Sequence, residues 1–305
     1  MNKLSEEILE KYQVRKTQRQ KLQFIELIKR NFPNVCVEEG GAIKSRNIIV
    51  GDVDKAKVVF TAHYDTCAAL PFPNLIFPRN IVLTVLYSLL ICVPLFVIMF
   101  LCNILLSLIT TDFFIHYFFS IGLFFLLFLG VFILGVPNRH TANDNTSGVV
   151  SLVELYDRLT PEEREKCAFV FFDNEENGLL GSAYFRRLHK NVQNSTLVIN
   201  IDCVGDGENL MLVFPKKLLE ELGDTISKSF EAVSHNKLNV MLCRSSTTMY
   251  PSDQAGFKKG IGVATLHKNF LGYYLGRIHT CRDTVCEEKN IKFVCDGFRN
   301  LISYL

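Results

Sequence analysis

Metal-binding residue types recur along this sequence at the ends of apolar runs and in polar loops. In chain order they are His63, Asp144, Glu176, Asp202 and His279, and Glu175 stands directly before Glu176. Two neighbouring divalent cations need imidazole and carboxylate ligands, one carboxylate that bridges them, and a free base beside the water that they activate. The sequence contains a candidate for each part, so a two-metal hydrolytic site is our first hypothesis.

The segment VVFTAHYDT predicts a strand that ends at a histidine. Side chains alternate along a strand, so His63 and Asp65 lie on the same side, where Asp65 can orient the imidazole of a metal-bound His63. Taken alone, a strand-end histidine beside a solvated aspartate is the better interpretation of this pair.

Two polar turns supply three of the four remaining carboxylates. ANDNTSGVV places Asp144 immediately before a helix, where it is the candidate bridge between cations or, alternatively, a helix N-cap. FVFFDNEENGLLGS carries Glu175 and Glu176 out of an apolar strand; adjacent side chains point in different directions, so Glu176 can bind metal while Glu175 removes a proton from water. Asp202 follows the run LVINI, and His279 lies in GRIHTCRDT.

Composition divides the chain into polar and apolar parts. The 33 Lys and Arg nearly balance the 31 Asp and Glu, which gives no reason to expect nucleic-acid binding. Between Arg79 and Arg139 the only charged residue is Asp112, and residues 81–109 and 113–137 are uncharged apolar runs. About 20 apolar residues span a bilayer. We therefore predict a transmembrane hairpin; two buried helices of a soluble core are the alternative.

The charges beside these runs predict an orientation. Arg79 and Arg139 flank the open end of the hairpin and its tip has neither Lys nor Arg, so both soluble segments are expected on the cytoplasmic side. The start of the chain lacks the apolar stretch of a secretory signal. The ten cysteines show no close CxxC pair and are expected to be reduced.

Alternating strands and helices predict an α/β three-layer sandwich with a mostly parallel, mixed central sheet covered by helices. Strands are expected at 47–50, 58–62, 168–172, 197–201, 210–214 and 261–266, and helices at 5–30, from 147, at 179–188, 217–233 and 291–302. The catalytic domain is then 1–80 plus 136–305, interrupted by a hairpin at 81–135. Because the hairpin leaves the active-site end of its strand, the site is expected near the membrane, with apolar or membrane-proximal peptides as substrates.

The motifs HYD, ANDNTSG, DNEENGLLGS, NID and IHTCRDT together resemble the zinc aminopeptidases of metallopeptidase family twenty-eight, such as bacterial leucyl aminopeptidase and aminopeptidase Y. The resemblance covers the soluble parts and not the hairpin. It implies two Zn²⁺, one held by His63 and Asp202, the other by Glu176 and His279, with Asp144 bridging them, Glu175 as general base, and peptide substrates with a free N-terminus. It also implies a cis peptide bond after Asp144.

The resemblance leaves three points open. Some family members have a tyrosine before the last ligand that stabilises the oxyanion, where this chain has Ile278; zinc itself, Tyr273 or Tyr274 are substitutes. Glutaminyl cyclases share the fold and much of the metal constellation, but their pockets use tryptophan, and this sequence has none. A non-catalytic scaffold of the same fold is the third possibility.

Overall fold

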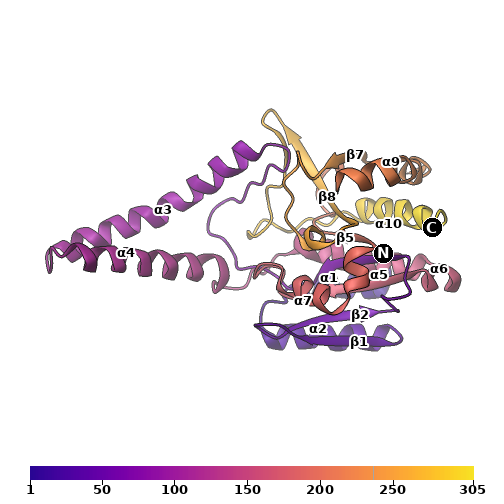
Figure 1. The fold of residues 1–305 in the computed structure, drawn as a ribbon, viewed down its shortest axis with the longest axis horizontal. Coiled ribbons are helices and arrows are strands. Elements are labelled where there is room, and N and C mark those ends of the chain that lie inside the picture. The colour runs from indigo at the N-terminus through magenta and orange to yellow at the C-terminus, as the bar shows by residue number, and fades with distance from the viewer. Residues whose placement is uncertain (236) are drawn as a thin grey trace.

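The computed structural model describes residues 1–235 and 237–305. In that part of the chain a mixed sheet runs in the order β1-β2-β4-β3-β5-β8-β6-β7, and β9 pairs with β8 (Figure 1). The strands β4, β3, β5 and β8 are parallel neighbours. The bounds are β1 Val35–Gly40, β2 Ser45–Val50, β3 Val58–His63, β4 Cys167–Phe172, β5 Leu197–Ile201, β6 Asn209–Phe214, β7 Asn239–Arg244, β8 Gly260–Asn269 and β9 Gly272–Tyr274.

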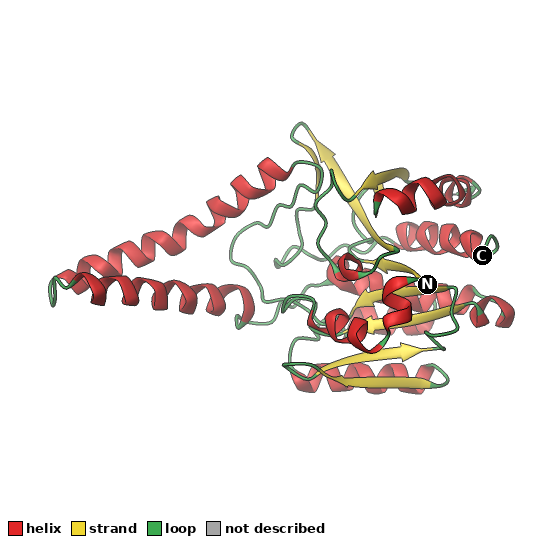
Figure 2. Cartoon of the chain, viewed as in Figure 1, coloured by secondary structure: helices red, strands yellow, loops and turns green. Residues whose placement is uncertain are grey.

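Helices cover both faces of this sheet (Figure 2). One apolar core joins the sheet to α1, α2, α5, α9 and α10, and a second joins its other face to α7 and α8. The bounds are α1 Lys3–Lys11, α2 Gln18–Asn31, α5 Gly148–Arg158, α6 Pro161–Glu165, α7 Leu180–Leu188, α8 Lys190–Asn194, α9 Lys216–Glu231 and α10 Glu288–Ile302, with a 3₁₀ turn, η3, at Asp253–Gly256. The predicted fold class is confirmed.

The central strands are apolar throughout because both of their faces are buried. In β4, Phe169 and Phe171 face the first core, while Val170 and Phe172 face the second. A strand with two buried faces shows a continuous apolar run instead of an alternating pattern, which explains why β4 could be predicted from its own residues.

The prediction of one helix over residues 5–30 is wrong, because the chain breaks between α1 and α2. Thr17 caps α2 by accepting from the Gln20 backbone N–H, and the Gln20 side chain accepts from the Thr17 N–H in return, which is a capping box. Just before it, Arg15 is fully buried, with its backbone N–H donating to Thr66 Oγ1 at 3.0 Å. A buried arginine in the connection turns the chain inward.

The edge strands β1 and β7 and the short β9 are missing from the sequence prediction. The sequence of β1 lacks a clear apolar pattern, because Glu38 and Glu39 stand in its second half. In β7, which has only six residues, buried positions alternate with half-buried ones and both end residues are exposed. Such edges are defined by pairing with neighbouring strands more than by local pattern.

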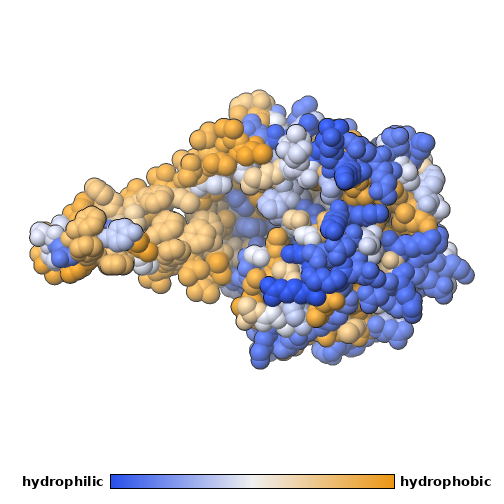
Figure 3. Space-filling view, viewed as in Figure 1, coloured by the Kyte–Doolittle hydropathy of each residue, from blue (hydrophilic) through white to orange (hydrophobic). Residues whose placement is uncertain are grey.

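The apolar insertion forms two long helices that project from the domain (Figures 1 and 2). They are α3, Ile81–Ser107, and α4, Phe113–Phe128, which continues as one π-helical turn, η1, Leu129–Ile133. Both are long and apolar enough to cross a membrane, and 6% and 0% of their most apolar windows are buried. Their apolar side chains face outward (Figure 3), so the alternative of helices buried in a soluble core does not hold.

Candidate metal centre

The site lies where β3, β4 and β5 end. His63 is the last residue of β3, Asp202 directly follows β5, and the loop after β4 carries Glu175 and Glu176. Because these three strands are parallel neighbours, their carboxyl ends meet at one edge of the sheet, and ligand sites of open α/β sheets form in the crevice there. The topology therefore gathers these side chains into one place.

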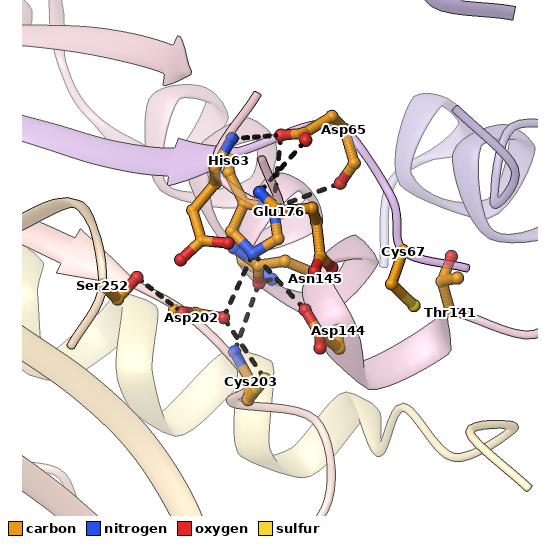
Figure 4. A network of polar contacts seen from close by, with 12 residues as sticks. His63, Asp65, Cys67, Thr141, Asp144, Asn145, Glu176, Asp202, Cys203 and Ser252 are labelled. Atoms are coloured by element: carbon orange, nitrogen blue, oxygen red, sulfur yellow. Dashed lines mark hydrogen bonds and ion pairs between the residues drawn. The ribbon is translucent and has the colours of Figure 1, made fainter. Parts of the chain in front are cut away.

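Asp144 lies between two histidines. Its Oδ1 is 3.3 Å from His63 Nε2, and its Oδ2 is 2.9 Å from His279 Nε2. His63 Nε2 also lies 3.5 Å from Asp202 Oδ1 (Figure 4). His279 Nε2 lies 3.4 Å from Glu176 Oε2. The two oxygens of one carboxylate thus face two separate groups, each consisting of a histidine and a second carboxylate.

The turn that carries Asp144 is held by side chains distant in sequence. Asp283 accepts from the Asn143 N–H at 2.8 Å and from the Asp144 N–H at 3.0 Å. Asn145 donates from Nδ2 to the Ile201 carbonyl at 3.1 Å. The Asp144–Asn145 peptide bond is cis, as expected. Both oxygens of Asp144 are left free to face the histidines.

Asp65 acts mainly on the glutamate loop in this geometry. Its Oδ1 accepts from the Glu175 N–H at 3.0 Å and its Oδ2 from the Glu176 N–H at 3.3 Å. His63 Nδ1 lies 3.1 Å from the backbone carbonyl of Asp65 and 3.7 Å from its carboxylate. The imidazole is thus oriented chiefly by a backbone oxygen, while the Asp65 carboxylate positions the two glutamates.

A series of hydrogen bonds that begins at Asn200 in β5 holds the Asp202 side chain in place. Ser252 Oγ donates to Asp202 Oδ2 at 2.7 Å, and Asn200 Nδ2 donates to Ser252 Oγ at 2.9 Å. The hydroxyl of Tyr250 donates to the Asp202 backbone carbonyl at 3.0 Å. Asp202 Oδ1 is thereby turned toward His63.

Burial and crowding perturb the charges of the site. Burial raises the pKa of Glu175 well above its usual value, with Glu176 and Asp253 acting in the same direction against His63. Burial also raises the pKa of Glu176 to about 7. Burial alone would lower the pKa of His279, but the carboxylates of Glu176 and Asp144 bring it to about 10. Positive charge placed among these carboxylates relieves their mutual repulsion.

All six residues proposed as ligands or base line one pocket of about 350 Å³: His63, Asp144, Glu175, Glu176, Asp202 and His279. Glu176 Oε1 is buried and has no hydrogen-bond partner among the described residues. Oxygen and imidazole donors grouped in this way suit Zn²⁺ and related divalent ions, so the residues present fit a pair of such ions.

Sequence reasoning missed several residues that the structure adds. The Cys67 sulfur, a Glu176 oxygen and a His279 nitrogen all lie within 4.8 Å of one another. Asp283 was visible in the motif IHTCRDT, but nothing in the motif assigns it to the Asp144 turn. Tyr250 lines the pocket, whereas the two tyrosines suggested for the oxyanion, Tyr273 and Tyr274, do not.

Residues 132–292, just over half of the chain, match the sequence model of Peptidase family M28. The chain therefore belongs to this peptidase family, which is the family that its motifs resemble. No curated protein sequence matches the chain.

Solved structures share the fold at low identity. LapA aminopeptidase of Legionella pneumophila is 12% identical with a TM-score of 0.55, over 98% of this chain and 67% of LapA. Glutaminyl cyclase of Porphyromonas gingivalis is 15% identical with a TM-score of 0.59, over 98% and 96%. A TET aminopeptidase from a marine sediment Thaumarchaeota archaeon is 12% identical with a TM-score of 0.53, over 99% and 96%. Both enzyme types share this fold, so the site must distinguish them.

Proposed function

We propose that this M28 peptidase is a dizinc aminopeptidase anchored in a membrane by the α3–α4 hairpin. The observation that carries the proposal is the position of Asp144, whose two oxygens lie 3.3 and 2.9 Å from the imidazoles of His63 and His279. A carboxylate shared between two separate histidines is the arrangement that a pair of neighbouring cations requires.

In this proposal, His63 and Asp202 bind one zinc, Glu176 and His279 bind the other, and Asp144 binds both. The zinc pair, when bound, polarises the scissile carbonyl and lowers the pKa of water. Glu175 takes the proton from that water and delivers it to the leaving amine. Its raised pKa suits a group that must accept a proton and then donate it.

Asp65 is a positioning residue in this scheme, because it holds the backbone of the base and of its neighbour through two hydrogen bonds. The pocket volume of about 350 Å³ lies at the low end of the range for ligand sites. It provides room for a short stretch of peptide, which favours removal of single N-terminal residues.

The proposal is tested by replacing Glu175 with glutamine. We expect turnover of aminoacyl reporter substrates to fall by about 10²–10⁴-fold, the usual contribution of a general base, while bound zinc stays near two per chain by elemental analysis. Glu208→Gln removes the same charge from a residue outside the pocket lining and should behave as wild type. Unchanged turnover in Glu175→Gln would falsify the assignment of the base.

Membrane anchoring is proposed from the hairpin itself. Its helices are apolar around their whole circumference and their side chains are exposed; a helix of this kind is suited to lipid. Arg79 and Arg139 at the open end favour the cytoplasmic side for the catalytic domain, which residues 1–80 and 136–305 form together. The intact chain should resist alkaline carbonate extraction from membranes, and a variant with a short polar loop in place of 81–133 should be released.

The two alternative functions, glutaminyl cyclase and non-catalytic scaffold, predict different products. A glutaminyl cyclase would convert a Gln-initiated peptide to the pyroglutamate form without cleaving a peptide bond, and the shared fold makes this assay necessary. A non-catalytic scaffold would bind little zinc and release no amino acid. Mass spectrometry of one Gln-initiated and one Leu-initiated peptide after incubation with the zinc-loaded protein separates all three.

A further inference from the structure

The lining of the candidate active-site pocket consists of a polar and an apolar group of side chains. The six acidic and histidine side chains described above form the polar group. The rest of the lining, called the apolar wall below, is mainly apolar and comes from the loop that precedes the hairpin, from the hairpin itself, and from the segments around Met249 and Leu275. A substrate whose reacting group lies among the six polar side chains has this apolar wall available for the side chain of its neighbouring residue.

The hairpin contributes to this wall through the first turns of α3. Thr84, Tyr87 and Ser88 line the pocket. Their spacing of three and four residues places them on one face of the helix. The Tyr87 hydroxyl donates to the Pro73 carbonyl at 2.8 Å, which ties the helix to the preceding loop. Leu86, on another face of the same turn, is 57% exposed. One side of α3 therefore belongs to the pocket and the other faces outward.

The second helix of the hairpin contributes Phe132, at the end of η1. Its ring lies 6.1 Å from the ring of Phe72 in the loop before α3, and 4.9 Å from the ring of Phe128, measured between centroids. These contacts fix the aromatic ring in place. The first turns of α3 and the end of η1 thus line the same pocket.

The length of α3 is compatible with this wall lying at the membrane boundary. Its 27 residues extend about 40 Å, and the apolar core of a bilayer is about 30 Å thick. If the tip end of α3 lies inside the apolar core, the excess of about 10 Å is the first two turns of α3, which carry Thr84, Tyr87 and Ser88.

A second apolar feature lies at the same level. The β8–β9 turn reaches toward the start of α3 in Figure 1 and exposes Phe270, at 94%, and Leu271. Beside it, the Tyr273 ring is flanked by Arg79 and Lys268, both within 5.4 Å of the ring centroid. Aromatic and basic residues together are typical of a membrane–water interface.

Resting on the proposed peptidase activity, we propose that the membrane-proximal turns of the hairpin form the specificity wall of the active site. Tyr87 and Phe132 receive the side chain of the N-terminal residue, and the enzyme acts on peptides whose N-terminal residue is large and apolar. The hairpin is then a part of the substrate site as well as an anchor. Small or charged N-terminal residues gain nothing from this wall.

The first test compares reporter substrates that differ only in the N-terminal residue, with the full-length zinc-loaded protein in detergent. Wild type should prefer Leu over Ala, and Tyr87→Ala and Phe132→Ala should each lower the Leu/Ala ratio of kcat/KM by about 10-fold or more, the usual range for lost apolar contact in a pocket. Leu86→Ala and Phe125→Ala, on exposed surfaces of the same helices, should leave the ratio unchanged. An unaltered ratio in both pocket variants overturns the proposal.

The second test does not depend on cleavage. A peptide that begins with photoreactive leucine, and whose first peptide bond is replaced by a reduced, non-hydrolysable bond, is irradiated with the protein and the adducts are mapped by mass spectrometry. Adducts at 84–88 or 129–133 are expected; adducts confined to 249–278, or none, contradict the proposal. Labelling of the hairpin in a protein that cleaves no reporter refutes the peptidase function and leaves the peptide-binding wall standing.

Discussion

Replacing Asp283 by alanine tests whether the Asp144 turn depends on a carboxylate from the far end of the chain. Asp283 is 1% exposed and accepts two backbone N–H groups, from Asn143 at 2.8 Å and from Asp144 at 3.0 Å. Alanine leaves both donors buried without an acceptor, and each such loss costs about 1–3 kcal/mol. The free energy of unfolding should therefore fall by about 2–6 kcal/mol.

The same change should weaken metal binding. Loss of a residue that orients a ligand typically lowers metal affinity by about 10–100-fold, and Asp144 is the ligand proposed for both ions. We expect a weaker affinity for zinc in competition with a chelating dye. The melting temperature in detergent should fall by roughly 5–20 °C, since 1 kcal/mol corresponds to about 2–4 °C for a domain of this size.

Asp296 provides the matched control. Its side chain is 25% exposed and pairs with Arg158 at 2.8 Å, and a pair of this exposure contributes about 1 kcal/mol or less. Asp296→Ala should therefore melt near the wild-type temperature and bind zinc normally. Equal melting shifts for Asp283→Ala and Asp296→Ala, together with full zinc affinity in both, would refute the reasoning that Asp283 holds the turn.

Three further predictions concern other parts of the molecule. The Cys67 sulfur lies beside the second proposed zinc position, so the cobalt-loaded protein should show a thiolate-to-cobalt absorption band that Cys67→Ala lacks; its absence from wild type excludes this sulfur as a ligand. A hydrogen bond to Asp206 raises the pKa of His267 in the folded protein. The His267–Asp206 pair therefore stabilises the fold fully below the pKa that His267 has in the unfolded chain, and this stabilisation is lost as the pH rises through the folded-state pKa of His267. Wild type should then lose more stability than His267→Gln between about pH 5.5 and pH 9, and parallel stability curves would contradict this. Replacing Phe270 and Leu271 by serine should slow cleavage of a Leu-initiated peptide anchored to vesicles and spare the soluble peptide, whereas equal effects on both would argue against insertion of this turn at the membrane.

The residues at the ends of central strands were predictable because two local signals coincide there. A buried parallel strand is a continuous apolar run, and polar side chains at its end or in the first residues of the following loop stand at the edge where such strands place their sites. His63, Asp202 and the Glu175–Glu176 pair all follow this rule. Their common location is therefore encoded locally, in the few residues that surround each of them.

The supporting contacts could not be predicted in this way, because they join residues far apart in the chain. Asp283 reaches the Asp144 turn across the fold, and Arg15 enters the core from a connection that reads as part of an amphipathic helix. The alternation of side chains along a strand predicts that Asp65 lies beside His63, and His63 Nδ1 is indeed 3.7 Å from the Asp65 carboxylate. The contacts of its carboxylate with the Glu175 loop depend on the pairing of β3 with β4 and are invisible in either segment alone.

The place of the insertion connects the proposed membrane anchor to the candidate site. The hairpin is inserted in the chain between His63 and Asp144. The segment that leads into it therefore begins at one proposed zinc ligand, and the segment that follows it ends at another. These two segments pair with each other through a bridge between Ala68 and Pro137, and the entering segment pairs with the domain through a bridge between Ile76 and Leu275. If the hairpin spans a bilayer as proposed, we expect a tilt of the hairpin to move the pocket wall relative to the proposed metal centre. Activity should therefore depend on bilayer thickness for Leu-initiated substrates more than for Ala-initiated ones, since only the larger side chain reaches the wall that moves.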